Sequence, residues 1–253
     1  MINPMDLTGK HFLVTGASSG LGRQTCITLS QLGARISLLA RNEEHLKQTI
    51  SQMEGVNHLV FPFDVSHIEE IEDLIQTIVC DNGRINGFVH AAGIGTIKPL
   101  SMTKYDFMKK MMDIHLFSFV EFIRIIGKKK YSEDGTSVVA VSSGATFSSD
   151  KGKVAYVASK GALDRVVKPI AIELGVNRKF RVNTINPGWI KTDMYYDFIE
   201  EFGQKRMEED LAGSFLGASE PIDIANLIAF LLSDASRMIT GQNIVIDGGW
   251  TIH

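Results

Sequence analysis

The sequence is poor in the features that mark disulfide-rich, metal-binding and membrane proteins. Its 253 residues include two cysteines, Cys26 and Cys80, which form no close-spaced motif, so neither a disulfide framework nor a cysteine-based metal site is expected. The seven histidines contain no H-E-x-x-H pattern, so metal catalysis has no support. Nothing at the N-terminus resembles a signal peptide and no apolar run reaches transmembrane length, which favours a cytoplasmic protein without a membrane partner.

An excess of charge of one sign is also missing. The net charge of -3 gives no reason to expect a nucleic-acid partner. Apolar residues make up 44% of the chain and charged residues 22%, as in ordinary globular proteins. The length is sufficient for one large α/β domain with a well-buried core, and no repeat, low-complexity segment or linker divides it. We therefore expect a single domain spanning residues 1–253.

Short apolar runs alternate with helical patterns along most of the chain. Such alternation predicts right-handed βαβ units and a parallel sheet. We expect a Rossmann-type, doubly wound parallel sheet of about seven strands with helices on both faces. The predicted strands are 10–15, 34–40, 58–65, 85–90, 137–143, 180–185 and 241–247, with helical patterns between them that include 43–53, 66–80 and 101–126.

A glycine-rich turn joins the first predicted strand to the first predicted helix. Gly16, Gly20 and Gly22 give the spacing G-x-x-x-G-x-G, which differs from the G-x-G-x-x-G of the general dinucleotide fingerprint. Such a turn lets backbone N–H groups approach a pyrophosphate, and the helix N-terminus favours its negative charge. A glycine-rich turn can also be only a turn, so its position between strand and helix is what favours a dinucleotide site.

Arg41 follows the second predicted strand, where the general fingerprint has an acidic residue for the ribose 2′-hydroxyl. Ala40 and Arg41 occupy those positions, and the next carboxylate is Glu43. An arginine suits the 2′-phosphate of NADP through charge-assisted hydrogen bonds. The alternative is that Arg41 merely faces solvent at a strand end.

Tyr156 and Lys160 are four residues apart in a helical pattern and therefore share one helix face. A free phenol has a pKa of ~10, and a nearby ammonium lowers the pKa towards the range useful for acid–base catalysis. The pair would be suited to donate a proton to a carbonyl oxygen or to remove one from a hydroxyl. A solvated helix face is the alternative. Pro169 lies further along and is expected to kink this helix or loosen one turn.

Taken together, these motifs resemble those of the short-chain dehydrogenase/reductase family, and the resemblance covers essentially the whole chain. Each motif is modest alone, but their order and spacing are specific. The residues that carry the resemblance are Thr15, Gly16, Gly20, Gly22, Asp64, Val65, Ala91, Ala92, Gly93, Ser143, Tyr156, Lys160, Pro187, Gly188 and Thr192.

The resemblance implies three catalytic roles. Ser143, thirteen residues before Tyr156, matches the family serine that hydrogen-bonds the substrate oxygen, and this spacing favours it over Ser142. Tyr156 matches the proton donor. Lys160 matches the residue that lowers the tyrosine pKa and holds the nicotinamide ribose.

The resemblance also implies an NADP(H) site. The glycine turn would hold the pyrophosphate, Asp64 the adenine amino group, and the residues after Pro187 and Gly188 the carboxamide. The full set implied is Gly16, Ser18, Ser19, Gly20, Leu21, Gly22, Arg41, Asp64, Val65, Ala91, Ala92, Gly93, Tyr156, Lys160, Pro187, Gly188, Ile190 and Thr192.

Two histidines replace asparagines of the family pattern. His90 stands at the first position of an N-A-A-G turn, where the asparagine mainly braces the sheet. His115 stands where an asparagine completes a Ser-Tyr-Lys-Asn tetrad, its backbone carbonyl ordering a water that connects the lysine to solvent. His115 keeps that carbonyl, but an imidazole is bulkier and can itself titrate near neutral pH. The proton relay is therefore the uncertain part of the implied mechanism.

Residues 189–213 are expected to form a flap over the substrate, because the family carries a mobile segment at this place. An ordinary amphipathic helix pair on the surface is the alternative. Lids of this kind exclude water and complete the site. The apolar wall of the flap would come from Met194, Tyr195, Tyr196, Phe198 and Phe202.

These features predict an NADP(H)-dependent oxidoreductase that interconverts a carbonyl and a secondary alcohol. Among family types, the sequence is most similar to 3-oxoacyl-carrier-protein reductases. A dinucleotide-binding sensor or scaffold with weak catalysis is the second hypothesis, and a nucleotide-sugar epimerase is disfavoured by the glycine spacing and the short C-terminal region. By analogy with the family we expect a homo-oligomer, a dimer or tetramer, that associates through helices 101–126 and 156–174.

Overall fold

The computed structural model describes residues 3–148 and 150–252, and a seven-stranded parallel sheet forms its centre. The strand order is β3-β2-β1-β4-β5-β6-β7, with every neighbouring pair parallel. This confirms the predicted doubly wound α/β fold. The strands are β1 (His11–Thr15), β2 (Arg35–Ala40), β3 (Leu59–Pro62), β4 (Ile85–His90), β5 (Ser132–Val141), β6 (Arg181–Pro187) and β7 (Asn243–Ile246).

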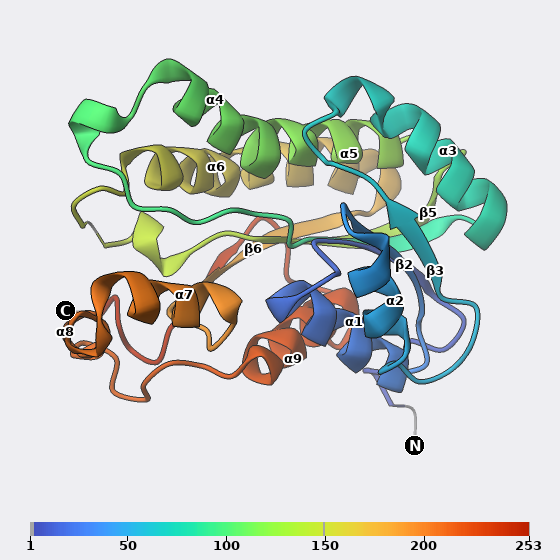
Figure 1. Ribbon diagram of the computed structural model, residues 1–253. Helices are drawn as coiled ribbons and strands as arrows, with labels where there is room; N and C mark the ends of the chain where they lie inside the picture. Colours follow the sequence, from blue (N-terminus) through green and yellow to red (C-terminus); the bar gives the residue numbers. More distant parts are fainter. Residues whose placement is uncertain (1–2, 149, 253) are drawn as a thin grey trace.

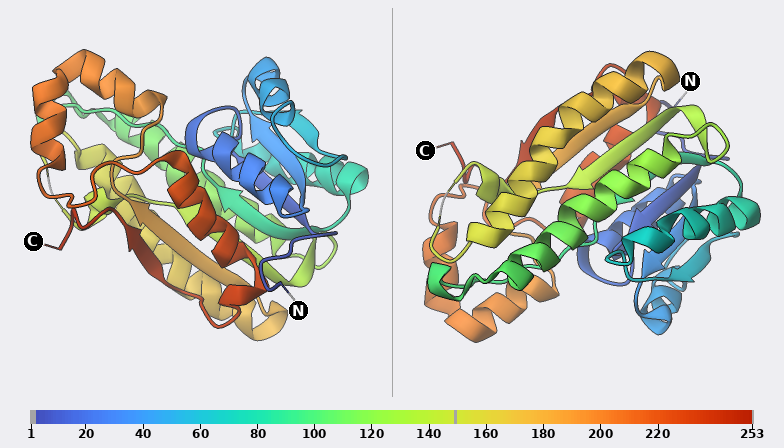
Figure 2. Two further views of the ribbon diagram at one scale, coloured as in Figure 1. Left: turned by 90° about the horizontal axis from the view of Figure 1, so that it is seen from below. Right: turned by 90° about the horizontal axis from the view of Figure 1, so that it is seen from above.

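Helices cover both faces of the sheet. In Figure 1, one layer above the sheet contains α3 to α6, and α1, α2 and α9 lie below it. Figure 2 shows the same two layers from below and from above, where α6 and α5 run side by side. The bounds are α1 (Gly20–Gln31), α2 (Glu43–Ile50), α3 (Ile71–Asn82), α4 (Tyr105–Met112), α5 (Ser118–Ile126), α6 (Val154–Arg178), α7 (Asp193–Phe202), α8 (Gln204–Leu211) and α9 (Pro221–Leu232), with short helical turns η1 (Ile68–Glu70), η2 (Leu100–Met102), η3 (Asp113–Phe117), η4 (Gly144–Thr146) and η5 (Asp234–Ser236).

Each face of the sheet has its own apolar core. Above the sheet, Phe88 of β4 packs against Phe119 and Phe122 of α5, with 5.2 Å between the Phe88 and Phe122 ring centroids. Below it, Leu29 of α1 and Ile228 of α9 are fully buried in the second core. Residues on both faces of the central strands are buried, which explains why these strands read as continuous apolar runs rather than alternating ones.

The strand order places a crevice at the C-terminal edge of the sheet. β1 pairs with β2 on one side and with β4 on the other, so the chain connections leave β1 and β4 in opposite directions. This reversal is the point at which open α/β sheets bind ligands. The glycine turn follows β1, and the Ala91-Ala92-Gly93 turn follows β4, so both flank the crevice.

The predicted helix 101–126 is divided in the structure. α4 and α5 are separated by η3, a π-helical turn over Asp113–Phe117 that carries His115. Such turns are rare and occur frequently at functional sites. Pro169 lies inside α6, which continues from Val154 to Arg178, so the proline does not end the helix. Pro169 is exposed, so the backbone carbonyl that loses its partner there can bond to water.

Residues 189–213 contain the helix pair α7 and α8, which pack together around Phe198 and Met207. Within the described residues, no helix combines the length and the apolar composition needed to cross a membrane. The same part of the chain holds no group of three or more His, Cys, Asp or Glu side chains arranged for a metal ion. Both cysteines are free thiols.

Candidate active site

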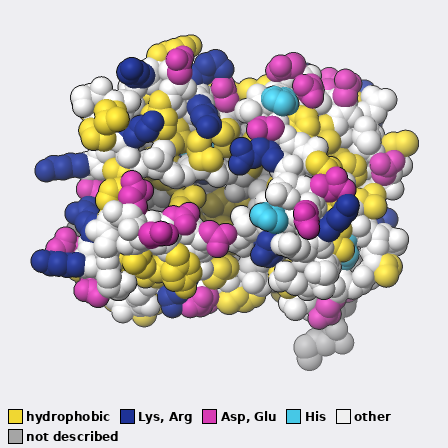
Figure 3. Space-filling model, viewed as in Figure 1, with side chains coloured by type: hydrophobic (Ala, Val, Ile, Leu, Met, Phe, Trp, Pro, Cys, Tyr) yellow, Lys and Arg dark blue, Asp and Glu magenta, His cyan; other side chains and the backbone are white. Residues whose placement is uncertain are grey.

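A cavity of about 920 Å³ opens at the C-terminal edge of the sheet. Figure 3 shows this hollow between the layer of α4 to α6 and the lip formed by α7, with hydrophobic side chains on its floor and acidic side chains along its lower lip. All twenty residues predicted from the sequence as catalytic or cofactor-binding line it. The structure therefore brings together residues from positions 16 to 192 of the chain.

The glycine turn forms a cradle of backbone at one end of the cavity. Gly16 has a φ of +70°, and a Cβ there would lie 2.8 Å from the Ala91 backbone. A Cβ on Gly22 would lie 2.1 Å from the Gly16 carbonyl oxygen, so neither position accepts a side chain. α1 begins here without a side-chain cap and without an acidic residue in its first turn. The free N–H groups of this helix end fit an anion such as a dinucleotide pyrophosphate.

The opposite side of this end is formed by residues after β2 and β3. Arg41 is exposed and lines the cavity together with Asn42 and His45. Desolvation opposes ionisation of Asp64, but hydrogen bonds from Ser66 at 2.9 and 2.7 Å and the charge of Arg41 hold the pKa of Asp64 below its ordinary value.

Ser143, Tyr156 and Lys160 meet in the middle of the cavity. Ser143 follows the end of β5, and Tyr156 and Lys160 lie one turn apart near the start of α6. The Ser143 hydroxyl hydrogen-bonds the Tyr156 phenol and also accepts the Ala145 backbone N–H at 3.2 Å. Lys160 Nζ donates to the Val141 carbonyl at 2.7 Å and lies 6.0 Å from the Tyr156 ring centroid. The geometry favours Ser143 rather than Ser142 as the serine that acts with Tyr156, because the Ser142 hydroxyl donates instead to the Lys160 carbonyl at 3.3 Å.

The acid–base properties of this group differ from the sequence-based expectation. Burial raises the pKa of Tyr156, and the hydrogen bond to Ser143 only partly opposes this rise. Lys160 is not among the groups that oppose this rise, and its ammonium donates to the Val141 carbonyl. Desolvation lowers the pKa of Lys160 to about 8, against a smaller opposite effect of Asp164. The lysine is therefore tuned to exchange a proton near neutral pH, while the phenol remains protonated.

A buried polar group holds the Ser143 turn in place, and the sequence reasoning did not identify it. Asn186 of β6 donates to the Ser143 carbonyl at 3.2 Å and to Asp164 at 2.9 Å. Thr146 donates to the same Asp164 carboxylate at 2.8 Å. Each residue had one clue in the sequence, its position beside a motif. Asn186 directly precedes the Pro187-Gly188 turn, and Asp164 lies one helical turn after Lys160.

The side chain of His115 is fully buried beside the catalytic helix. Its Nε2 accepts the Ile94 backbone N–H at 3.0 Å, and its Nδ1 lies 2.8 Å from the Ser159 hydroxyl. Because the backbone N–H can only donate, Nδ1 carries the proton and donates to Ser159. Ser159 in turn donates to the Tyr156 carbonyl at 2.8 Å. Desolvation, followed by the charges of Lys160 and His90, lowers the pKa of His115 far below its ordinary value, so this imidazole is neutral.

His90 has the opposite tautomer. Its Nε2 donates to the Ile114 carbonyl of the π-helical turn at 3.2 Å, and its Nδ1 accepts from the Thr15 hydroxyl at 3.2 Å. Thr15 also accepts the Ala92 backbone N–H at 3.1 Å. Desolvation and the charge of Lys160 lower the pKa of His90 to about 3. His90 therefore connects β1, β4 and the π-helical turn as a neutral brace, which agrees with the bracing role the sequence predicts.

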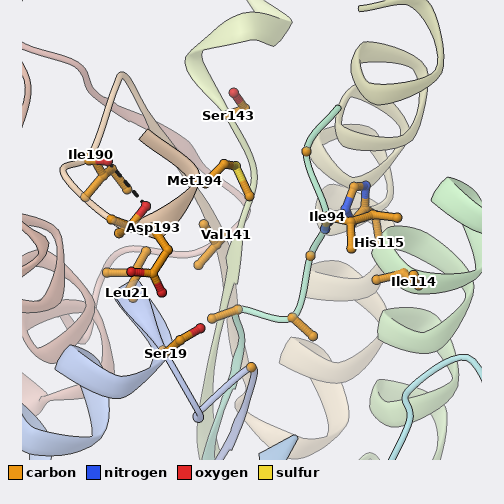
Figure 4. Close-up of a pocket in the computed structure, with 18 of the residues that line it drawn as sticks. Ser19, Leu21, Ile94, Ile114, His115, Val141, Ser143, Ile190, Asp193 and Met194 are labelled. Atoms are coloured by element: carbon orange, nitrogen blue, oxygen red, sulfur yellow. Dashed lines mark hydrogen bonds between the residues drawn. The ribbon is translucent and has the colours of Figure 1, made fainter. Parts of the chain in front are cut away.

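The wall from residues 189–213 is mostly as predicted. Met194, Tyr195, Phe198 and Phe202 line the cavity, whereas Tyr196 does not line it and is 57% exposed, so that part of the prediction was wrong. α7 exposes Tyr196 because it is amphipathic and turns its other face, with the buried Tyr195 and Phe198, inwards. In Figure 4, Met194 reaches across the cavity towards Ile94, and His115 lies behind Ile94 on the far side. A Cβ on the neighbouring Gly95 would lie 2.7 Å from Met194 Sδ, so the two sides are in contact here.

The sequence reasoning missed further cavity residues: Asn42, His45, Ile94, Gly95, Lys153 and Trp250. Lys153 could have been identified from the sequence, because it lies three residues before Tyr156 and therefore close to the same helix face. Trp250 could not have been identified in this way, because only the tertiary fold brings the C-terminal segment against Gly144.

Comparisons with known proteins agree with this geometry. Residues 16–251 match a family model described as enoyl-(acyl carrier protein) reductase. The chain is 32% identical over 251 residues to a 3-oxoacyl-(acyl-carrier-protein) reductase of Thermotoga maritima, covering 98% of this chain and 100% of that protein. It is 29% identical over 247 residues to L-xylulose reductase of Caenorhabditis elegans, covering 97% of each.

A solved structure with a very similar fold is that of a putative short-chain alcohol dehydrogenase from Sinorhizobium meliloti. It superimposes with a TM-score of 0.91 at 28% sequence identity and covers 99% of both chains. The similarity therefore extends over the whole described fold, including both sides of the cavity.

Proposed function

Because the chain belongs to the short-chain dehydrogenase/reductase family of oxidoreductases, we propose that it interconverts a carbonyl group and a secondary alcohol with NADP(H) as the cofactor. The observation that carries the proposal is the meeting of Ser143, Tyr156 and Lys160 in one cavity with a side-chain-free anion cradle. The family uses nicotinamide dinucleotides. The choice of NADP(H) over NAD(H) rests on Arg41 and on the absence of an acid at Ala40.

The cofactor site is proposed from the residues that line the cavity. The backbone of the glycine turn would hold the pyrophosphate, and Arg41 the 2′-phosphate, with Asp64 near the adenine. Lys160 would hold the nicotinamide ribose. A bound nicotinamide supplies or accepts the hydride at the substrate carbon.

Proton transfer to and from the substrate oxygen would be carried out by side chains of this protein. In the reduction direction, the Ser143 and Tyr156 hydroxyls bind the carbonyl oxygen, and Tyr156 donates its proton as negative charge develops there. The phenolate is then reprotonated through Lys160, whose lowered pKa of about 8 suits proton exchange. We propose that the backbone carbonyl of His115, not its imidazole, serves the water that links Lys160 to solvent, because both imidazole nitrogens already have partners.

Residues 189–213 are proposed as the substrate flap. Their apolar and aromatic side chains line the cavity opposite Tyr156, and Met194 touches the loop after β4. Substrate choice would be set here. The names of the relatives include a thioester reductase and a sugar reductase, so 3-oxoacyl thioesters remain one candidate class among several. A cytoplasmic location and a homodimer or homotetramer stay predictions from the sequence and the family.

The test is a screen of NADPH oxidation over ketones, sugars and 3-oxoacyl thioesters with the wild-type protein and Tyr156→Phe. The proposal expects at least one substrate that the wild type reduces and that Tyr156→Phe reduces much more slowly. A dinucleotide-binding sensor would bind NADPH, turn over none of these substrates and be unaffected by Tyr156→Phe beyond a small change in stability.

A further inference from the structure

Lys153 is a positively charged residue among those that line the cavity. It is the N-cap residue of α6, three positions before Tyr156, and both side chains line the same cavity. Its side chain is only 12% exposed. Lys110, which also lines the cavity, is exposed, and Lys160 is committed to the catalytic group. Lys153 is therefore the partly buried lysine of this cavity that the proposed mechanism leaves unused.

The Lys153 ammonium lies between two indole rings. The ring centroids of Trp189 and Trp250 are each 5.8 Å from Nζ. Such cation–π contacts stabilise the charge, but an indole ring is not a full hydrogen-bond acceptor for any of the three ammonium N–H groups. Trp189 comes from the segment after β6 and Trp250 from the C-terminal segment, so the surroundings are assembled from three parts of the chain.

The polar contact of this ammonium within residues 3–148 and 150–252 is long. Nζ lies 3.5 Å from Asp150 Oδ2, at the outer limit of a hydrogen bond. The same Asp150 carboxylate is held at 2.9 Å by Arg206 and at 2.7 Å by the Lys151 backbone N–H. Asp150 is thus shared with stronger partners and does not fully pair Lys153. A partly buried ammonium whose ion pair is long gains from a further acceptor, which favours a ligand that supplies one.

A second donor beside Lys153 also lacks an acceptor. The Trp189 indole Nε1 is buried and has no hydrogen-bond partner among the described residues. Asp210 Oδ2 is an unpartnered acceptor in the same region, but Asp210 pairs with Arg206 on α8 and does not line the cavity. Among the described groups that line the cavity here, Lys153 is the one that offers a positive charge with free N–H donors.

From this arrangement we propose that Lys153 binds the carboxylate of the substrate, and that the carbonyl substrates are oxo acids whose carboxylate lies a few carbons from the carbonyl. The inference rests on the proposed function, because Tyr156 fixes where the reacting oxygen lies. Lys153 directly precedes the first turn of α6 and Tyr156 lies in that turn, so the two side chains line the cavity from neighbouring positions. Three acids, Asp193, Asp197 and Glu201, also line the cavity, but all three are exposed, so solvent and salt weaken their repulsion of a carboxylate.

The test compares an oxo acid with its own uncharged ester. Levulinate and methyl levulinate share one carbon skeleton and one ketone and differ in the charge that Lys153 would meet. With NADPH, the wild type is expected to reduce levulinate with a kcat/KM about ten- to a hundredfold above that of the ester, as a charge-assisted hydrogen bond predicts. Lys153→Met keeps the aliphatic stem and should abolish this preference, mainly by raising KM for the acid while kcat/KM for the ester stays unchanged.

Two further variants serve as controls. Lys151→Met makes the same change of charge two residues away at an exposed position, and it should leave the acid-over-ester preference intact. Lys153→Arg keeps the charge and should restore part of the preference, although its planar head differs in shape from an ammonium. Equal loss of acid and ester reduction in Lys153→Met would mean that Lys153 serves only the structure of the loop, and would overturn the inference.

Binding can be followed without turnover, because the only two tryptophans of the chain are the two that flank Lys153. Valerate, which has no ketone, should change the tryptophan fluorescence of the wild type, whereas methyl valerate and the Lys153→Met protein should show a response at least tenfold weaker. This titration separates the two proposals. Carboxylate binding without reduction of any ketone would refute the proposed function alone, and ketone reduction without carboxylate preference or valerate binding would refute the role of Lys153 alone.

Discussion

His115 Nδ1 lies 2.8 Å from the Ser159 hydroxyl, and this contact connects the π-helical turn to the catalytic helix α6. Ile94 donates to the other ring nitrogen, and Ser159 donates onward to the Tyr156 carbonyl. Every hydrogen bond in this series has a fixed direction. Protonation of the His115 ring would place a hydrogen on Nε2 against the Ile94 N–H. It would also add a positive charge near the Lys160 ammonium.

The first prediction concerns His115. His115→Asn keeps the backbone carbonyl and a side-chain acceptor for Ile94, so turnover should stay within a few fold of the wild type. The pH profile of kcat should have no inflection in the ordinary histidine range in either protein, because the wild-type imidazole stays neutral. A folded, NADPH-binding His115→Asn protein without activity would show that the imidazole itself takes part in the relay.

The second prediction concerns stability in acid. The pKa of His11 is lowered to about 4 and that of His90 to about 3, mainly by desolvation, and that of His115 is lowered further. Unfolded histidines bind protons below pH ~6.5, so the unfolded chain gains protons that the folded chain does not. The free energy of unfolding should therefore fall as the pH drops below ~6.5, by up to about 1.4 kcal/mol per pH unit for each buried histidine.

Urea unfolding between pH 5 and 7 measures this slope. His90→Asn removes one of the three groups and should make the slope shallower by about 1.4 kcal/mol per pH unit. His67→Asn changes an exposed histidine and should leave the slope as it is. An unaltered slope in His90→Asn would mean that His90 is protonated in the fold.

The third prediction concerns the choice of cofactor. Arg41→Ala combined with Ala40→Asp exchanges a cation for an acid at the position of the 2′ group. The wild type should bind NADPH more tightly than NADH, and the double variant should show the reverse order. Fluorescence titration of the two cofactors gives the dissociation constants, and equal affinity of the wild type for both would contradict the role of Arg41.

The fourth prediction concerns the proton donor and its lysine. Tyr156→Phe should leave NADPH affinity nearly unchanged and lower turnover by about 10²–10⁴-fold, the usual contribution of a general acid. Lys160→Ala should also weaken NADPH binding, because it removes a hydrogen bond to the ribose, and should slow turnover, because it removes the group that reprotonates Tyr156. Lys160→Arg should rescue only part of the loss.

A substrate that the wild type and Tyr156→Phe reduce equally fast would show that the proton comes from another group. In the wild type, reduction should slow as the pH rises through about 8, where Lys160 loses its proton. Steady-state rates at saturating NADPH across this range test that dependence.

The fifth prediction concerns the contact between the two sides of the cavity. A methyl group at Gly95 would meet Met194 Sδ at 2.7 Å, so Gly95→Ala should displace the Met194 side chain and raise KM severalfold with little loss of stability. Met194→Ala in the same protein should restore KM. Gly161→Ala, which adds a methyl into open space, is the matched control. A normal KM in Gly95→Ala would show that this contact has no part in substrate binding.

The sequence predicted the fold and most of the cavity because both depend on local patterns. β4 was located residue for residue, since its apolar run ends directly at the Ala91 turn, and the glycine turn was recognised from its glycines and its position between a strand and a helix. Other features depend on the tertiary environment. Desolvation of Tyr156 and Lys160, the position of Trp250 and the outward direction of Tyr196 follow from packing between distant segments, which no local pattern records.

The start of β5 shows the same limit. The sequence predicted the strand from residue 137, but it begins at Ser132, where a register shift against β4 separates the Ile85 pairing from the Gly87 pairing. The polar residues of this first part carry no strand pattern. Arg178 of α6 donates to the Ser132 carbonyl at 2.9 Å and helps to hold it in the sheet.

The π-helical turn at Asp113–Phe117 fixes how α4 and α5 are rotated relative to each other. A π-turn holds one residue more than an α-helical turn, and each residue of an α-helix advances the rotation by about 100°. Deleting one residue here would let α4 and α5 join as a regular helix, but it would turn His115 away from Ile94 and Ser159 or turn the apolar face of α5 away from Phe88. The chain length between these two helices is thus part of the active-site geometry, and an insertion or deletion there would act on the site in a way that no point substitution reproduces.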